Sequence, residues 1–175
     1  MPGGRIDTER AFTALGLAVL TISDTRDAGN DTSGDLLAER IGAAGHHLRA
    51  RAVIRDDMAA IQQQVKAWIE DPGVDVVITN GGTGLRPRDV TPEALRRLFD
   101  REFEGFLVLW HLISYETVGV STLQSRACAG IAGNTVIYVL PGSTGACKDG
   151  WDKLISLQID SRHRPCSIVE LLGPK

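Results

Sequence analysis

The sequence has few cysteines, and their spacing excludes two kinds of site. Only Cys128, Cys147 and Cys166 occur among the 175 residues, far apart and without a CxxC pair or a zinc-like Cys/His spacing. An odd number of widely spaced thiols does not indicate a disulfide framework. We interpret the three as small apolar side chains in a reducing compartment.

Long apolar runs and an excess of basic charge are also missing. No stretch approaches the roughly 18 consecutive apolar residues of a membrane helix, and the first residues, MPGGRIDTERAF, lack the apolar segment of a secretion signal. The net charge is −3 and the isoelectric point is about 5.8, which does not favour general binding to a nucleic-acid backbone. We therefore expect a cytoplasmic protein with no membrane and no nucleic-acid partner.

What the sequence contains is an alternation of strand-like and helix-like segments. Apolar runs rich in β-branched residues predict buried strands at residues 15–23, 74–79 and 136–140, and a partly alternating segment predicts a further strand at residues 46–54. Segments with helical spacing separate them, which favours right-handed crossovers. The pattern predicts a single three-layer α/β domain over residues 14–175, with a mostly parallel sheet and helices on both faces. Residues 1–13 are expected to form a flexible polar arm.

Polar residues mark where the helices are expected to begin. Thr32 or Ser33 is the expected cap of the first helix, and Asp56 or Asp57 stands at the start of the second. Thr91, followed by proline and glutamate, satisfies three criteria for a helix start. Ser143 or Thr144 is expected to begin the last long helix, and the tail is expected to turn at residue 165 and add a short strand or an edge segment.

Residues 104–115, EGFLVLWHLISY, predict a helix that is apolar on nearly all sides. Such a helix is not a solvent-facing one. It lies either in the interior of the domain or at an interface between subunits, and the two alternatives are compatible.

Three loops with the same chemical character follow predicted strands. They read SDTRDAGNDTSG, NGGTGLRPRD and PGSTGAC, and each precedes a predicted helix whose first turn offers free N–H donors. Ligands of open parallel sheets bind outside the carboxyl ends of the strands. The shared position predicts a site for a phosphate-bearing ligand.

The middle loop is the strongest candidate, although it is neither a Walker loop nor GxGxxG. Its glycines allow close approach of a ligand, and Arg88 and Asp89 could hold phosphate oxygens and a bridging Mg²⁺. The alternatives remain a plain tight turn for the glycines, and a helix cap or ion pair for Asp89. Ser143 and Thr144 either contact a ligand or only cap a helix, and the acids Asp24, Asp27 and Asp31 are individually weak candidates.

The loop TNGGTGLRPRDVTPEAL resembles the signature of the MoaB/MogA family of molybdenum cofactor biosynthesis proteins, roughly GGTG followed by RDVTPEA. Segments DTSG, AGHH, TLQSRACAG, LPGSTGAC and RHRPC are also similar, in the same order, so that the resemblance covers residues 15–170. It favours the MoaB branch over MogA.

This resemblance implies molybdopterin adenylyltransferase activity, in which AMP from Mg-ATP is joined to the phosphate of molybdopterin with release of pyrophosphate. It implies functional roles for Asp89, with a Mg²⁺ contact, and for Asp56. The candidate contacts to the nucleotide or pterin are Ser23, Asp24, Asp31, Ser33, Asn80, Gly81, Gly82, Thr83, Gly84, Arg88, Gly142, Ser143 and Thr144.

The resemblance also implies a homotrimer or a hexamer, and handover of the product to a downstream metal-insertion protein. The alternative function is that of a non-catalytic protein that binds and delivers molybdopterin. Adenylylation fits the residues because a phosphomonoester has a second pKa near 6 and is largely ionised at neutral pH. Catalysis then needs positioning and charge neutralisation more than a strong base.

Overall fold

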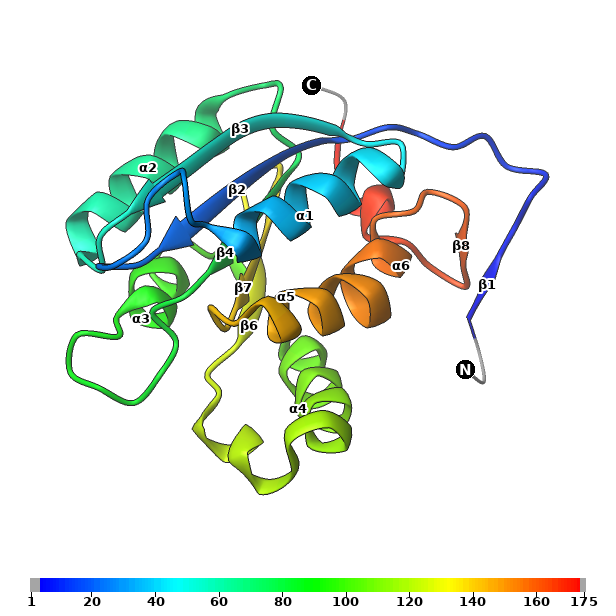
Figure 1. Ribbon diagram of the computed structural model, residues 1–175. Helices are drawn as coiled ribbons and strands as arrows, with labels where there is room; N and C mark the ends of the chain where they lie inside the picture. The colour runs from blue at the N-terminus through cyan, green and yellow to red at the C-terminus, as the bar shows by residue number, and fades with distance from the viewer. Residues whose placement is uncertain (1–3, 174–175) are drawn as a thin grey trace.

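The apolar runs of the sequence form the parallel centre of a six-stranded sheet in the computed structural model, which describes residues 4–173 (Figure 1). The strand order is β3 (His47–Ile54), β2 (Gly16–Ile22), β4 (Val76–Asn80), β7 (Thr135–Leu140), β6 (Cys128–Ala132) and β5 (Arg101–Glu102). The first four strands are parallel to one another. β6 pairs antiparallel with β7, and β5 pairs antiparallel with β6. The predicted fold, mostly parallel with helices on both faces, is confirmed.

Helices cover both faces of this sheet because its central strands are apolar on both sides. On one face lie α1 (Thr32–Ala43), α4 (Glu104–Val118) and a helical run of α5 (Thr144–Gly150), η2 (Trp151–Ile155) and α6 (Ser156–Gln158). On the other lie α2 (Met58–Glu70) and α3 (Thr91–Arg96). The shorter elements are β1 (Arg5–Ile6), β8 (His163–Arg164), η1 (Gly119–Gln124) and η3 (Ile168–Leu171).

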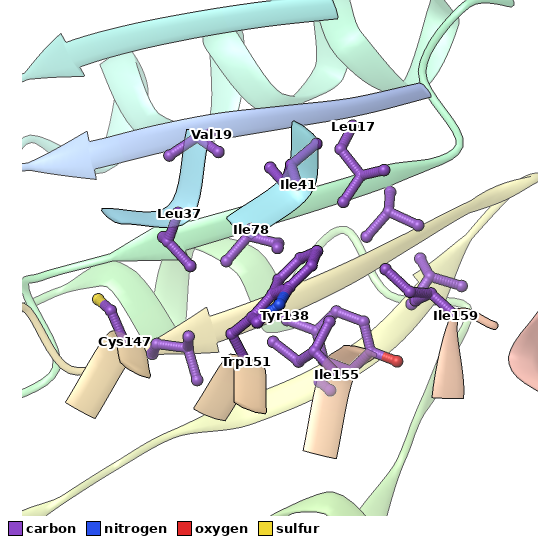
Figure 2. Close-up of a cluster of buried hydrophobic side chains, with 14 of the residues drawn as sticks. Leu17, Val19, Leu37, Ile41, Ile78, Tyr138, Cys147, Trp151, Ile155 and Ile159 are labelled. Atoms are coloured by element: carbon purple, nitrogen blue, oxygen red, sulfur yellow. The ribbon is translucent and has the colours of Figure 1, made fainter. Parts of the chain in front are cut away.

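Alternation along β2 shows how one strand serves two cores. Leu17 and Val19 belong to the first cluster, which Figure 2 shows between the sheet, α1 and the helical run from α5 to α6. Ala18 and Leu20 belong to the second cluster, under α2 and α3. Successive side chains of a strand point to opposite faces, so every residue of β2 is buried.

The segment predicted as a polar arm packs against the domain where it is described. β1 pairs antiparallel with β8, and Arg10 donates to the carbonyl of Ser161 at 3.1 Å. The ring of Phe12 lies 5.0 Å from that of His46. Residues 4–13 therefore run along the domain, whereas residues 1–3 lie outside the described part of the chain. The short strand predicted in the tail is β8.

Two predicted helix caps differ from the structure. Asp31, and neither Thr32 nor Ser33, caps α1 by accepting from the backbone N–H of Gly34 at 3.0 Å. Val90 precedes α3 without a capping side-chain bond, so Thr91 is the first helical residue. The carboxylate of Asp31 reaches the first turn from one position earlier, which leaves the two hydroxyls for other contacts. Asp57 and Ser143 cap α2 and α5, each being one of the two predicted alternatives.

Helix α4 is buried on only one narrow side. Phe106, Trp110 and Ser114 are buried, whereas five of its apolar residues are each at least 50% exposed: Val108, Leu109, Leu112, Tyr115 and Val118. The expectation of a helix inside the domain is therefore wrong for most of its surface. Among the described residues, α4 and η1 together (residues 104–124) have the length and apolar composition of a membrane helix. A single helix of this kind is only weak evidence that the chain spans a membrane.

Candidate functional site

The three loops predicted to form the site meet at the carboxyl edge of the parallel strands. The backbone N–H of Gly81 donates to the carbonyl of Leu140 at 3.1 Å, and Gly142 packs directly on Gly81. The hydroxyl of Ser33 donates to the carbonyl of Gly142 at 2.9 Å. The loops after β2, β4 and β7 are thus joined to one another, as the parallel topology requires.

The glycines at the centre of this edge leave no room for a side chain. Gly81 has φ +98° and a Cβ there would lie 2.1 Å from the carbonyl oxygen of Ile22. Gly82 has φ +63°, and a Cβ there would lie 2.2 Å from Thr91 Oγ1 and 2.7 Å from Asp56 Oδ2. Both conformations favour glycine. The loop therefore brings a carboxylate and a hydroxyl directly against its backbone.

Two buried polar atoms beside these glycines have no hydrogen-bond partner. Within residues 4–173, the buried side-chain oxygens or nitrogens that lack a hydrogen-bond partner are Asn80 Oδ1 and Thr91 Oγ1. Asn80 donates through Nδ2 to Thr21 Oγ1 at 2.9 Å, which fixes the amide while its oxygen stays unpaired. Buried polar atoms are nearly always satisfied, so the pair indicates a place where a ligand or water binds.

Asp56 sits in surroundings that disfavour its charged form. One carboxylate oxygen accepts from the backbone N–H of Val90 at 3.3 Å. Burial raises the pKa of Asp56, and the negative charges of Asp89 and Asp24 raise it further, against the opposing effects of the Val90 hydrogen bond and Arg88. The three carboxylates are therefore close enough to interact, although they come from loops after three different elements.

Asp89 lies at the far end of the glycine loop and is held there by an arginine. Its Oδ2 accepts from the backbone N–H of Arg86 at 3.0 Å. The guanidinium of Arg126 donates to the carbonyl of Gly84 at 2.9 Å, to the carbonyl of Asp89, and to the carboxylate of Glu93. One side chain thus ties both ends of the loop to α3.

Arg88, predicted as a phosphate clamp, forms an ion pair with Asp24 of the first loop. Its side chain is 63% exposed. The pair connects the loop after β2 with the loop after β4 at the surface of the site. Arg88 therefore stands beside the carboxylates, where a ligand phosphate could compete with Asp24 for the guanidinium.

Asp31 occupies a different position from the ligand contact that we predicted. Its side chain is fully buried, and its oxygens accept from Thr21 Oγ1 at 2.7 Å and Arg51 Nη2 at 2.8 Å. Burial acts to raise the pKa of Asp31, but the hydrogen bonds from Arg51, Gly34 and Thr21 outweigh it and the pKa is lowered. Asp31 therefore holds the first loop in place from inside.

The remaining predicted residues lie on the same edge. Ser23 accepts from the backbone N–H of Arg26 at 3.2 Å and stabilises the first turn. Thr144 Oγ1 lies 3.3 Å from Ser33 Oγ, and Ser143 accepts from the backbone N–H of Ala146 at 3.1 Å as the cap of α5. Thr83 is buried, and the carbonyls of Thr83 and Gly84 face Arg126.

Two cavities open at the loops of this edge. The first, here called the β3-edge cavity, has a volume of about 540 Å³ and is lined by residues 51–55 and by Ser23, Asp24, Arg26, Asp27 and Ala28. The second, here called the α4 cavity, has a volume of about 320 Å³. Its lining includes Thr83, Gly84, Trp110, Ser114, Thr117, Ser125, Pro141, Ser143 and Asp149. Such volumes suit small-molecule ligands.

The carboxylates of Asp56 and Asp89 are better suited to a metal ion that binds together with a phosphate ligand than to a metal ion that is always bound to the protein. Within residues 4–173, no group of three or more His, Cys, Asp or Glu side chains is placed to hold a metal ion. Mg²⁺ commonly uses one or two carboxylates together with substrate phosphates and water. Asp56 and Asp89, with the unpaired Thr91 Oγ1 next to Asp56 at Gly82, match that kind of donor set.

Several residues of this edge were missed by the sequence. The sequence predicts Thr91 as a helix cap, and it predicts the segment that contains Arg126, residues 121–135, as irregular or a hairpin. Arg51 lies on β3 and Arg55 follows its last residue, without a recognisable motif around either. The signal for Arg126 was its place in TLQSRACAG, which carried part of the family resemblance.

Fold and site together define an α/β domain of the molybdopterin-binding class. The family model described as a probable molybdopterin binding domain matches residues 18–161. The chain is 46% identical over 163 residues to molybdenum cofactor biosynthesis protein B of Escherichia coli K12, covering 93% of this chain and 95% of that protein. It is 46% identical over 138 residues to the protein of the same name from Bacillus cereus, covering 78% and 82% of the two chains.

Solved structures agree with this relationship. A crystal structure of a molybdenum cofactor biosynthesis protein B superposes with a TM-score of 0.83 at 42% identity, covering 86% of this chain and 94% of that one. The tungsten cofactor synthesizing protein MoaB from Pyrococcus furiosus gives a TM-score of 0.72 at 36% identity, with coverages of 80% and 89%. The chain belongs to the MoaB/MogA family, in its MoaB branch, and is a molybdenum cofactor biosynthesis protein.

Proposed function

We propose that the protein catalyses the Mg-ATP-dependent adenylylation of molybdopterin. The observation that carries the proposal is the position of Asp56 and Asp89 at the glycine loop, where their charges interact. Asp56 and the unpaired Thr91 Oγ1 both lie against Gly82, and Asp89 lies against Gly84, which lines the α4 cavity. A reaction between two substrates needs a binding site for each substrate and a position where their reacting atoms come into contact. The α4 cavity, with Trp110 and several hydroxyls, suits the pterin.

The reaction requires little acid–base chemistry from the protein. A phosphate oxygen of molybdopterin attacks the α-phosphorus of ATP, and the bond from that phosphorus to the bridging oxygen breaks. The electron pair leaves with pyrophosphate, and AMP becomes joined to molybdopterin. Because the attacking phosphate is largely ionised at neutral pH, no base is needed to remove a proton.

The protein's own contribution is positioning and charge. Backbone N–H groups of the glycine loop and the guanidinium of Arg88 are suited to hold phosphate oxygens. Mg²⁺ brought in with ATP supplies charge neutralisation on the phosphates, and Asp89 and Asp56 are the carboxylates that would hold it. Arg126 keeps Asp89 at the end of the loop.

The test is the rate of AMP transfer from Mg-ATP to molybdopterin by the wild type and by Asp89→Asn. Removing a carboxylate that organises phosphate charge is expected to lower kcat at least about 100-fold. Asp57→Asn is the matched control: asparagine caps a helix as well as aspartate, so the rate should stay within about twofold. A wild type no faster than Asp89→Asn would contradict the proposal.

A second function is favoured by the exposed apolar face of α4, which is available for contact with another protein. The protein would then bind molybdopterin and deliver it to a downstream metal-insertion protein without catalysis. Calorimetry separates the two functions. Binding of molybdopterin with no binding of Mg-ATP supports delivery, whereas binding of both supports adenylylation. A cytoplasmic location and a homotrimeric or hexameric assembly belong to either proposal.

A further inference from the structure

The β3-edge cavity contains a group of arginines for which the family resemblance offered no role. β3 is the edge strand of the sheet, and the cavity lies beside it at the end of β2. Arg26, Arg51 and Arg55 line it, against the carboxylates of Asp24 and Asp27. Three guanidinium groups and two carboxylates thus line one space of about 540 Å³.

Two of these arginines are fixed by the interior of the domain. Arg51 donates to two neighbouring carboxylates, to Asp31 Oδ2 at 2.8 Å and to Asp35 Oδ1 at 2.6 Å. Arg26 donates to Ser33 Oγ at 2.8 Å. Because an arginine has five N–H donors in a rigid fork, such anchoring orients the group and leaves donors for a ligand.

The third arginine is held less tightly, and the acids are already occupied. No hydrogen bond or ion pair of the Arg55 side chain is found within residues 4–173, and the residue is exposed. Asp24 pairs with Arg88, and Asp27 Oδ1 accepts from the backbone N–H of Gly29 at 2.8 Å. The donors that remain available in the cavity are therefore mainly cationic, which favours an anion with several oxygens.

We propose that the β3-edge cavity is the polyphosphate subsite, which takes the β- and γ-phosphates of ATP and then the pyrophosphate product. This inference rests on the proposed adenylylation. Asp24 lines the cavity and its charge acts on Asp56, so the cavity adjoins the place where the α-phosphorus would react. Breaking of the bond to the bridging oxygen puts negative charge on the departing pyrophosphate, and the guanidinium groups stabilise that charge.

The experiment is calorimetric titration of the full chain with Mg-pyrophosphate and, separately, with AMP. Arg55→Gln removes one guanidinium that has no partner among the described residues, so folding should be unaffected. Loss of one charge-assisted contact is expected to weaken pyrophosphate binding about tenfold and to leave AMP binding within about twofold. Arg49→Gln, on β3 and outside the cavity lining, is the matched control and should leave pyrophosphate binding unchanged.

Three outcomes would overturn the subsite: pyrophosphate affinity unchanged in Arg55→Gln, equal weakening in both variants, or no binding of millimolar pyrophosphate to the wild type. Failure of the proposed function looks different. It would be absence of AMP transfer to molybdopterin by a wild type that still binds pyrophosphate in an Arg55-dependent way.

Discussion

Asp56 shows at the scale of one residue how a site can cost stability. Its pKa is raised, first by burial and then by the charges of Asp89 and Asp24, so the folded protein binds the proton more tightly than the unfolded chain. Such a group stabilises the fold below its unfolded pKa, and the contribution is lost as the pH rises through the folded pKa. At neutral pH the ionised Asp56 therefore works against folding.

Asp56→Asn removes that charge and keeps an oxygen that can accept from the N–H of Val90. We expect the variant to unfold about 2 °C higher than the wild type at pH 7, with the difference narrowing as the pH falls toward 4. The same substitution should lower the rate of AMP transfer at least about 100-fold. Thermal melts at several pH values, with Asp57→Asn as control, measure the effect. A melting temperature that drops at pH 7 would refute this account of Asp56.

At the scale of elements, the glycine loop depends on a side chain from elsewhere in the chain. Arg126 stands just before β6 and donates to carbonyls at both ends of residues 83–89 as well as to Glu93 of α3. Its side chain is 25% exposed, so these bonds are partly shielded from water. Lysine has the charge but cannot make several bonds in one plane.

We therefore expect Arg126→Lys to loosen the loop. AMP transfer should fall about 10- to 100-fold in kcat, because Asp89 is no longer held in place. Trypsin should cut after Arg88 faster than in the wild type, since local opening exposes the bond. Arg40→Lys, which alters an ion pair with Asp152 away from the loop, is the control. Equal trypsin resistance of Arg126→Lys and the wild type would show that the loop holds itself.

The elements also show what sequence can and cannot predict. The runs around β2, β4 and β7 were predictable because buried parallel strands are continuously apolar, and their carboxyl ends bring the loops together. The capping of α1 by Asp31 could not be predicted, because Asp31, Thr32 and Ser33 are all good capping residues. The choice among them depends on which side chain is buried in the folded domain. The contacts of Arg126 could not be predicted because they join segments that are far apart in the sequence. Arg55 could not be assigned because no motif surrounds it, and its place in the β3-edge cavity appears only in the folded chain.

At the scale of the whole molecule, both cavities lie at the loops that follow the parallel strands. The β3-edge cavity lies at the ends of β3 and β2, and the α4 cavity lies at the loops after β4 and β7. Asp24 borders the first cavity, and Gly84 borders the second. If the proposed adenylylation is correct, such an arrangement would give each substrate a cavity of its own.

The thiols test how tightly the domain is packed. Burial raises the pKa of Cys128 and of Cys147 to about 12, whereas Cys166 is exposed. A thiol of that pKa is hardly ionised at pH 8 and is also shielded from reagents. We expect one fast-reacting thiol per native chain and three after unfolding in guanidinium, measured with a chromogenic disulfide reagent. Fast reaction of a second thiol in the native protein would contradict the packing of β6 or α5.

The exposed apolar surface of α4 bears on assembly. Val108, Leu109, Leu112 and Tyr115 are each at least half exposed, and Val120 and Leu123 of η1 are 71% and 80% exposed. A surface of that kind on a single chain is typical of an interface. We expect light scattering at low micromolar concentration to give a multiple of 18.9 kDa, corresponding to a trimer or hexamer.

Leu112→Asp would place a charge in the middle of that surface and should shift the protein toward the monomer, because an unpaired charge is costly to bury. Leu171→Asp, at a 55% exposed leucine of η3, is the control and should leave the mass unchanged. A wild type that scatters only as an 18.9 kDa species would reject the assembly. An assembly that persists in Leu112→Asp would place the interface on another face, and α4 would then be free to contact the protein that receives the product.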